Sequence, residues 1–358
     1  MNAARYFILV LIDRPASRPR SEGPWLRRCG KSGSLAPVPE TIDIGWVLLG
    51  LILLYFGAEW LVRGASELAI RFGISPLVVG LTVVAFGTSA PELVVSVKAN
   101  LDGKGGMAIG NVVGSNICNI GLVLGVGAAI FPLAIRRQVI RREMPVLLVA
   151  TVVFLLMMWD GVLNRLESGV LFGGIIWYVV TSLVEARKED HDVSDDVPPE
   201  VIEAAKKGGS GRLIFNILLI VIGAVVLVIG ADRMVTGGEE IARFYGVPEA
   251  IIGLTLFAFG TSLPELATSV VAAIRKQGDI IVGNAVGSCI FNLLAVLGLA
   301  GLISPLAGDG VTVVHLSVML LVSVILMPMM WHRMRLDRWE GILLAVAYLG
   351  FTGWLVVA

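Results

Sequence analysis

The sequence GTSAPE at residues 87–92 recurs as GTSLPE at residues 260–265, and each copy lies inside an apolar stretch long enough to cross a membrane. A carboxylate in hydrocarbon costs about 2.5–3.5 kcal/mol even on the mildest scale, so it is seldom found there without a partner or a function. Glu92 and Glu265 occupy matching places in two copies of one unit. The motif therefore predicts a paired, functional carboxylate site inside a membrane protein.

The composition agrees with a membrane location. Of the 358 residues, 56% are hydrophobic and only 16% are charged, whereas roughly a quarter are charged in soluble domains. The mean hydropathy is +0.86, and the zero net charge gives no reason to expect a nucleic-acid partner. Apolar runs of about 17–25 residues predict an all-α, polytopic protein with about ten transmembrane helices in the lipid bilayer. The predicted spans are 45–62, 74–99, 107–131, 144–159, 166–184, 213–231, 247–274, 279–303, 311–331 and 339–357.

Two segments fall outside these spans. Residues 1–44 carry seven Arg and Lys residues and only a short apolar run, so we interpret them as a disordered or non-native N-terminal extension. Residues 185–212 are rich in charge and, at 28 residues, too short for an independent domain. We therefore expect a first five-helix membrane repeat at 45–184, a linker at 185–212 and a second five-helix repeat at 213–358.

The chain aligns with itself without a gap when Gly57 is placed on Gly230, an alignment called the repeat register below. Between residues 57–132 and 230–305, 34 of 76 positions are identical. Five spans in each repeat are an odd number, so the second repeat must enter the membrane from the opposite side, which is the inverted-repeat arrangement of many transporters. With 185–212 in the cytoplasm, the inner loops hold 16 Arg and Lys residues and the outer loops hold 5. This asymmetry predicts a multi-pass protein of the cell membrane with a cytoplasmic linker.

The two prolines predict interrupted helices at the carboxylates. A proline inside a helix lacks the N–H that the carbonyl four residues earlier would accept, so Pro91 frees the Gly87 carbonyl and Pro264 frees that of Gly260. In a membrane such oxygens are tolerated where they line a polar cavity or bind a cation. The neighbouring Thr and Ser hydroxyls and the carboxylates add further oxygens, and an all-oxygen set suits Na⁺, Ca²⁺ or Mg²⁺.

A second polar set follows each motif, at residues 110–119 and 283–292. Ser115 and Asn119 are four residues apart and share one helical face, as do Ser288 and Asn292. We expect these faces to meet the interrupted helices. Glycines at 110, 114, 121, 125, 283 and 287 predict close helix packing. For Asn111 and Asn284 the pattern leaves open whether they serve the site or only join helices.

Other repeated or reactive residues are not expected to take part in the site. Glu59/Asp232 and Glu67/Glu240 lie near the ends of spans, where solvation at the membrane interface is expected. No acid other than Glu92 and Glu265 is expected at comparable depth. His315 has no partner motif, and Cys29, Cys118 and Cys289 show no metal or redox spacing.

The two GTSxPE motifs, with GSNICN following the first at residues 114–119, resemble the signature repeats of the sodium/calcium exchanger family, in the cation/Ca²⁺ exchanger superfamily. The resemblance covers about residues 45–358. It implies a prokaryotic-type antiporter, not an enzyme, with Ca²⁺ and Na⁺ as substrates and no cofactor. It also implies that Glu92 and Glu265 bind Ca²⁺ with the backbone oxygens of Thr88 and Thr261. Sodium ions would use the Ala85 carbonyl, Ser89 and Ser115 toward one side, and the Ala258 carbonyl, Thr261, Ser262 and Ser288 toward the other, with Asn119 and Asn292 flanking the middle.

Two positions depart from the family pattern. Cys289 replaces the usual asparagine after the serine of the second repeat, and because the implied ligand set skips this position we expect little effect. Asn292 is neutral where potassium-dependent relatives carry an aspartate, which argues against a requirement for K⁺.

The residues themselves favour exchange. Two glutamates give the site a charge of −2, which one Ca²⁺ or two Na⁺ would neutralise, so the ions must take turns. A Ca²⁺/H⁺ antiporter and a K⁺-dependent Na⁺/Ca²⁺ antiporter remain alternatives within this class. A cation channel and an intramembrane hydrolase with paired carboxylates are alternatives of other classes. The motifs do not encode stoichiometry or oligomeric state.

Overall fold

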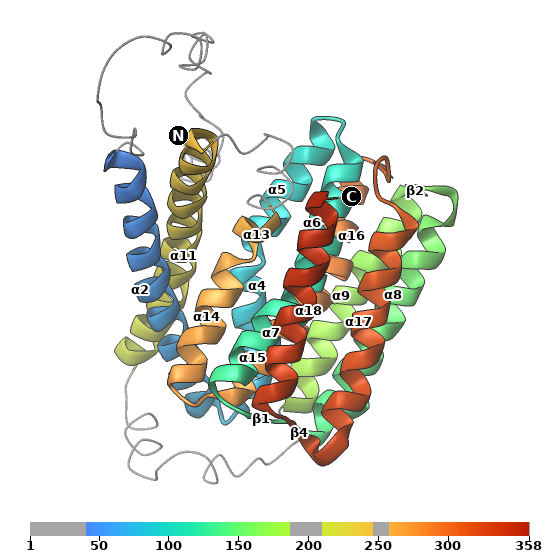
Figure 1. Cartoon of the computed structure of the whole chain (residues 1–358). Helices are drawn as coiled ribbons and strands as arrows, with labels where there is room; N and C mark the ends of the chain where they lie inside the picture. Colours follow the sequence, from blue (N-terminus) through green and yellow to red (C-terminus); the bar gives the residue numbers. More distant parts are fainter. Residues whose placement is uncertain (1–40, 187–209, 246–257, 358) are drawn as a thin grey trace, which may run out of the picture. The chain divides into compact units, whose positions relative to one another are not determined.

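The protein is all-α in the part of the chain that the structure describes. A computed structural model describes residues 41–186, 210–245 and 258–357, which belong to one compact unit, Pro39–Ala358. The expected extension at 1–44 and the linker at 185–212 lie almost entirely outside the described residues. Every predicted span coincides with helix, although the start of span 247–274 lies in the undescribed segment. The predicted fold class, a polytopic helical protein built of two five-helix repeats, is confirmed (Figure 1).

The described elements of the second repeat follow the same order as their counterparts in the first. The first repeat contains α2 (Thr41–Phe72), α3 (Pro76–Val79), α4 (Ala85–Thr88), α5 (Ala90–Leu101), α6 (Gly105–Cys118), α7 (Leu124–Ile130), β1 (Leu133–Ala134), α8 (Met144–Met157), β2 (Val162–Leu163) and α9 (Arg165–Ala186). The second contains α11 (Ser210–Phe244), α13 (Ala258–Thr261), α14 (Leu263–Ile274), α15 (Gly278–Phe291), α16 (Leu297–Ile303), β3 (Leu306–Ala307), α17 (Val313–Trp331), β4 (Arg335–Leu336) and α18 (Arg338–Val357).

Two short antiparallel ribbons tie the repeats to each other. Leu133 in β1 pairs with Leu336 in β4, and Leu163 in β2 pairs with Leu306 in β3. The repeat register converts one ribbon into the other, because Leu133 corresponds to Leu306 and Leu163 to Leu336. Each ribbon therefore joins a turn of one repeat to a turn of the other. The pairing is the signature of a pseudo-two-fold axis between the repeats.

Glycines bring the long helices α2 and α11 into backbone contact, and the two run side by side in Figure 1. A Cβ atom on Gly57 would lie 2.8 Å from the backbone nitrogen of Leu227. A Cβ atom on Gly230, the equivalent residue of the second repeat, would lie 2.8 Å from the backbone nitrogen of Leu54. Such distances leave no room for a side chain, so the two helices approach as closely as small residues permit in membrane proteins.

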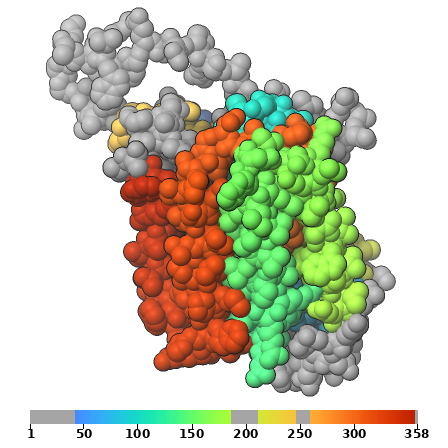
Figure 2. All heavy atoms as spheres, turned by 90° about the vertical axis from the view of Figure 1, so that its right-hand side faces the viewer, coloured from blue at the N-terminus to red at the C-terminus, as the bar shows by residue number. Residues whose placement is uncertain are grey.

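The surface is apolar along the outer helices, as a lipid-facing surface requires. Figure 2 shows α17, α8 and α9 as adjacent columns on one face. Large apolar side chains are exposed along these columns, including Val149, Leu156, Trp177 and Leu321. Six unbroken helices in the described ranges are long and apolar enough to cross a membrane, and the bent pair formed by residues 76–88 and 90–101 makes a seventh. The chain is therefore a membrane protein.

The interrupted helices differ in one detail from the expectation. The helix does not run through Pro91: α4 ends at Thr88, Ser89 leaves the helical region (φ −81°, ψ 4°), and α5 begins at Ala90. The two segments are bent by 44°. Proline sits in the first turn of the new helix, where its missing N–H is not needed. The second repeat is built alike, with Ser262 between α13 and α14.

The helices that follow each carry a π-helical turn at a polar residue. One π turn spans Asn119–Val123 between α6 and α7, and the other spans Asn292–Val296 between α15 and α16. A π turn inserts one extra residue into a helical turn and is frequent at functional sites. Both predicted central asparagines therefore open a local widening of their helix.

Candidate cation site between the repeats

Glu92 and Glu265 are both fully buried, and each stands in the first turn of the helix that follows its interruption. The N-terminus of a helix carries unsatisfied N–H groups and a partial positive charge, which favours a carboxylate there. The sequence places the acid one residue after the proline, and the break before it turns this position into a helix start. Each broken helix thus delivers one carboxylate to the interior of the membrane protein.

Hydroxyl groups from both repeats surround the two carboxylates. Ser115 donates to Oε1 of Glu92 at 3.5 Å, and Ser89 donates to Oε1 of Glu265 at 3.3 Å. The hydroxyls of Thr88 and Ser288 lie 3.5 Å apart, and those of Thr261 and Ser115 also lie 3.5 Å apart. Three of these four contacts join one repeat to the other. The structure therefore brings the predicted Thr and Ser residues to one place between the repeats.

The remaining predicted residues lie on the same segments. Asn119 and Asn292 are fully buried at the starts of the π turns. The carbonyl of the buried Ala85 accepts the backbone N–H of Ser89 at 2.9 Å, and Ala258 is the first residue of α13. The hydroxyl of Ser262, between α13 and α14, is buried.

Several polar atoms of this cluster have no hydrogen-bond partner within the described ranges, although they are buried. They are Oε2 of Glu92, Oε2 of Glu265, Oδ1 and Nδ2 of Asn119, Oδ1 of Asn292 and Oγ of Ser262. Buried polar atoms are paired in most proteins, because each unpaired one loses its contacts with water. Five of the six unpaired atoms are oxygens, the atoms that alkali and alkaline-earth cations prefer. The cluster has the chemistry of a cation site.

Glu143 shows what a structural carboxylate looks like in the same protein, and it corrects one expectation. No acid besides Glu92 and Glu265 was expected at such depth, yet Glu143 is fully buried immediately before α8. Both of its oxygens are satisfied: Tyr178 donates at 2.8 Å and Gln138 at 3.0 Å. The expectation was wrong because it considered each stretch by itself: Gln138 is close in the sequence, but Tyr178 reaches Glu143 from α9.

Comparison with known proteins identifies the fold and its family. The family model described as "Sodium/calcium exchanger protein" matches residues 42–184 and 215–357. The chain belongs to the sodium/calcium exchanger family. The family is one of transporters, as the resemblance of the motifs implied.

Several related proteins match this chain along most of their own length. The putative antiporter CaxA of Alkalimonas amylolytica is 36% identical over 310 residues, covering 86% of this chain and 96% of its own. The sodium/calcium exchanger MaX1 of Methanosarcina acetivorans is 33% identical over 344 residues, covering 87% and 97%. A structure of the sodium-calcium exchanger NCX_Mj soaked with Na⁺ and Sr²⁺ superposes with a TM-score of 0.73 at 33% identity, covering 86% and 96%.

Residues outside the predicted set also reach the exchanger's polar cluster. Asn111 and Asn284, left open between two interpretations, make hydrogen bonds to threonines of the opposite repeat. Asn116 accepts a hydrogen bond from Nδ2 of Asn292 at 3.2 Å and donates one to the carbonyl of Cys289 at 3.2 Å. The sequence signal for Asn111 and Asn284 was their place in the repeated GNxxGS pattern, which could not say which helix they would meet. Asn116 follows the pattern at a position where the second repeat has Cys289.

The acids near the ends of spans and His315, which were interpreted as surface residues, make contacts away from Glu92 and Glu265. Glu59 pairs with Arg275, and Glu67 with Arg63 and Arg212, all at partly exposed positions. His315 caps α17 together with Thr312. Cys118 and Cys289 are buried free thiols, while Cys29 lies outside the described residues.

The predicted glycine contacts are confirmed for four positions. Gly283 and Gly287 pack on the backbone of the segment 77–81, Gly121 packs on Tyr348, and Gly125 packs on the backbone of Gly341. Gly110 does not show the predicted packing: it is exposed, and no atom of the described residues lies within 4 Å of a Cβ placed there. For Gly114 close packing stays a prediction.

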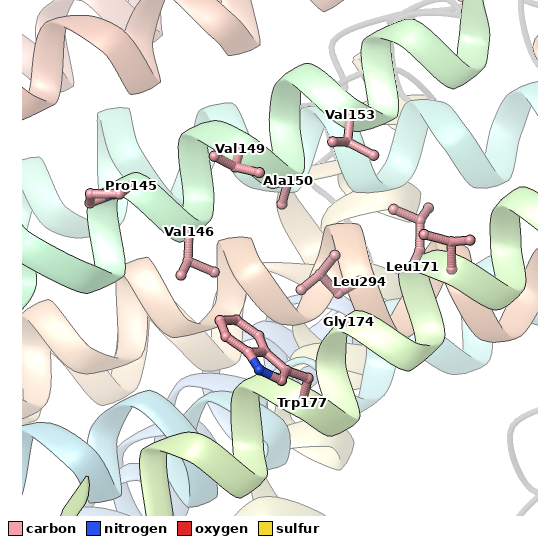
Figure 3. A pocket seen from close by; sticks show the side chains of 10 residues that line it. Pro145, Val146, Val149, Ala150, Val153, Leu171, Gly174, Trp177 and Leu294 are labelled. Carbon is pink, nitrogen blue, oxygen red and sulfur yellow. The ribbon is translucent and has the colours of Figure 1, made fainter.

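An apolar groove of about 360 Å³ lies between α8 and α9 (Figure 3). Val146, Val149, Leu171 and Trp177 are among its lining residues, with Leu294 at its floor. It offers no carboxylate or hydroxyl oxygen among these side chains, so it suits hydrocarbon and not a metal cation. Among the described residues, the oxygen-rich cluster between the repeats, and not this groove, has the chemistry of a cation site.

Proposed function

We propose that the protein is a secondary active antiporter that exchanges Na⁺ for Ca²⁺ by alternating access, with its cation site at Glu92 and Glu265. The observation that carries the proposal is the pair of buried carboxylates, each with an oxygen that has no protein partner in the described ranges. Glu143, equally buried, has both oxygens satisfied. Membership of the sodium/calcium exchanger family supports the choice of ions.

Ca²⁺ binds at the centre, between Glu92 and Glu265, with help from the backbone oxygens of Thr88 and Thr261. Na⁺ ions bind on either side. The Na⁺ ions on one side are bound by the Ala85 carbonyl, Ser89 and Ser115. Those on the other side are bound by the Ala258 carbonyl, Thr261, Ser262 and Ser288. Asn119 and Asn292 flank the centre. No cofactor is needed.

Exchange follows from competition for shared oxygens. The two carboxylates carry a charge of −2 that either one Ca²⁺ or two Na⁺ can neutralise, so the site cannot hold both full sets. Because like charges repel strongly where water is excluded, the empty site is costly and the ions must replace one another. Inverted repeats supply the outward-open and inward-open states around this fixed site.

The orientation follows from the loops. With the linker 185–212 in the cytoplasm, the inner loops carry 16 Arg and Lys residues against 5 outside, the bias expected of cytoplasmic loops. The protein then lies in the cell membrane, with its repeats at 45–184 and 213–358 of opposite orientation.

Uptake of ⁴⁵Ca²⁺ into proteoliposomes tests the function. Vesicles are loaded with Na⁺, with K⁺ or with an acidic buffer, and diluted into choline medium with ⁴⁵Ca²⁺. Uptake driven by the Na⁺ gradient alone, collapsed by a Na⁺ ionophore, supports the proposal. Uptake driven by the acidic interior without Na⁺ would establish a Ca²⁺/H⁺ antiporter instead, and uptake that needs both Na⁺ and K⁺ would establish a K⁺-dependent exchanger.

A further inference from the structure

An ion pair joins α2 of the first repeat to the end of α14 in the second. Nε of Arg275 donates to Oε2 of Glu59 at 2.9 Å, and Nη2 of Arg275 donates to Oε1 of the same carboxylate. With 33% of Arg275 and 26% of Glu59 exposed, both side chains are partly shielded from water. A bidentate pair of this kind fixes the relative position of two segments more strictly than a single contact does.

The equivalent residues in the repeat register are both acids. Glu59 corresponds to Asp232 on α11, and Arg275 corresponds to Asp102, directly after α5. Both aspartates are exposed, and neither side chain makes a hydrogen bond or an ion pair among the described residues. Two carboxylates repel each other, so Asp102 and Asp232 cannot form the contact that Glu59 and Arg275 make. The ion pair therefore exists in only one of the two halves.

The helices that carry these residues also differ in their packing. α2 lies against α14 (Figure 1), whereas the equivalent helices, α11 and α5, make no comparable contact. All four helices lie within the described ranges, so the difference does not arise from an undescribed segment. α2 and α11 are held to each other by backbone contact at Gly57 and Gly230, and they therefore form one helix pair. This pair leans on the second repeat through α14 and has no matching contact with α5.

The contacts of α2 and α11 are expected to interchange when access alternates. Inverted repeats exchange roles between the two access states, so the opposite state should bring α11 against α5 and take α2 away from α14. The pair of Glu59 and Arg275 then breaks, and Asp232 approaches Asp102 instead. One state is stabilised by an ion pair, whereas the other brings two negative charges together.

We propose that the Glu59–Arg275 ion pair is a latch that favours the access state described by the structure, and that Asp102 and Asp232 leave the opposite state without an equivalent latch. The proposal rests on the proposed function, because only an alternating-access protein takes up both states. The latch acts on the balance between the two states and not on the ligands of the ion. It therefore sets how much of the time the site faces each side of the membrane.

Pulsed electron paramagnetic resonance on the full-length protein in lipid nanodiscs measures the balance between the states. Spin labels are attached at Gly45→Cys on α2 and Trp339→Cys on α18, so the distance between them reports the position of α2. Both sites accept a label, because no atom of the described residues lies within 4 Å of a Cβ on Gly45 and Trp339 is exposed. Cys29→Ser removes one native thiol, and Cys118 and Cys289 are buried. Two distance populations are expected, one for each access state.

Glu59→Gln is expected to shift the ratio of the two populations roughly twofold to fivefold away from the described state, in line with a partly exposed ion pair. Asp102→Arg should shift the ratio the same way, because it supplies the opposite state with the ion pair that it lacks. Adding Asp232→Asn to Asp102→Arg should abolish that shift. Residues 102 and 232 make no ion pair in the described state, so a coupling between them would arise in the opposite state.

Glu67→Gln is the matched control for the loss of an ion pair. Glu67 pairs with Arg63 on its own helix and with Arg212 on α11. These contacts lie inside the helix pair, so their loss should leave the ratio at its wild-type value. Arg275→Gln breaks the same ion pair as Glu59→Gln from the other side, and it decides the question if the glutamate variant does not fold.

The latch is overturned if breaking the Glu59–Arg275 pair leaves the ratio unchanged, or if Glu67→Gln shifts the ratio as much. It is also overturned if the shift caused by Asp102→Arg survives the addition of Asp232→Asn, or if all variants show one and the same distance population. Absence of Na⁺-driven ⁴⁵Ca²⁺ uptake by the wild type would overturn the proposed function, whereas the distance populations decide on the latch whatever ion drives transport.

Discussion

Ser89 of the first repeat donates a hydrogen bond to Oε1 of Glu265 in the second repeat, at a distance of 3.3 Å. The repeat register turns this pair into Ser262 and Glu92, yet within the described part of the chain the Ser262 hydroxyl has no hydrogen-bond partner. The two halves of the cluster are therefore equivalent in sequence but differ in this contact. Under the proposed alternating-access function, inverted repeats exchange roles between the two access states, and the missing contact is then the one expected in the opposite state.

This asymmetry predicts opposite effects of two matched substitutions. Ser89→Ala removes a contact made in the present conformation, and Ser262→Ala removes the one expected in the other, so each should shift the population away from its own state. The half-saturating Ca²⁺ concentration, measured separately from the two sides of oriented vesicles, should move in opposite directions for the two variants. Changes in the same direction on both sides would show that the contacts do not alternate.

Glu92→Gln and Glu265→Gln should each abolish Na⁺-driven Ca²⁺ flux, because each removes half of the charge that neutralises the ion. Glu143→Gln is the matched control: it changes an equally buried glutamate whose oxygens are already satisfied by Tyr178 and Gln138. The control should retain Na⁺-driven flux, since that carboxyl group lies outside the site. Size-exclusion profiles in detergent verify that all three variants fold. Near-normal flux in folded Glu265→Gln protein would contradict the site assignment.

The core of the site could be predicted because the features that mark it lie within short stretches of the sequence. Two carboxylates in apolar stretches, each one residue after a proline, need no knowledge of the fold to be recognised as a pair. The repeat supplied the rest, because an alignment of the two halves without a gap fixes which residues are equivalent. Five of the predicted residues carry the unpaired buried polar atoms of the cluster.

What escaped prediction depends on contacts between distant segments. The Thr261–Asn111 hydrogen bond spans 150 residues, and no periodicity indicates which helical faces meet. The π turns at Asn119 and Asn292 arise where one extra residue enters a turn, which a search for regular helical spacing cannot detect. Glu143 was missed for the same reason, since Tyr178 reaches it from a different helix.

The backbone contact between α2 and α11 predicts that a larger residue at Gly57 lowers the stability of the protein. Gly57→Ala should destabilise the protein although alanine is the better helix former by about 1 kcal/mol, because its Cβ would lie 2.8 Å from the Leu227 nitrogen. Gly45→Ala, on the same helix, is the control: nothing lies within 4 Å of that Cβ. Thermal unfolding in detergent should show a lower midpoint for Gly57→Ala only. Equal midpoints would mean that the two helices can separate without cost.

The choice of ions can be tested at Asn292, which is neutral where potassium-dependent relatives carry a carboxylate. Its Nδ2 donates to Oδ1 of Asn116, whose own amide nitrogen is engaged by the Cys289 carbonyl. Asn292→Asp would turn that donor into an anionic oxygen facing another oxygen, and it would add a third buried carboxyl group to the cluster that contains Glu92 and Glu265. Like charges in a buried site cannot all stay ionised, so the added carboxylate must recruit a cation or a proton.

Wild-type exchange should therefore proceed without K⁺, whereas Asn292→Asp should make Ca²⁺ uptake depend on K⁺ or on pH. Uptake of ⁴⁵Ca²⁺ into Na⁺-loaded vesicles, with K⁺ or choline in the medium and at several pH values, measures both. Asn119→Asp changes the equivalent residue of the first repeat. If it also makes Ca²⁺ uptake depend on K⁺ or pH, the added charge acts at the centre of the site; if it does not, the charge acts on one side only. An absolute K⁺ requirement in the wild type would contradict the prediction and place the protein with the potassium-dependent exchangers. It would mean that a second cation is needed even when residue 292 is a neutral asparagine.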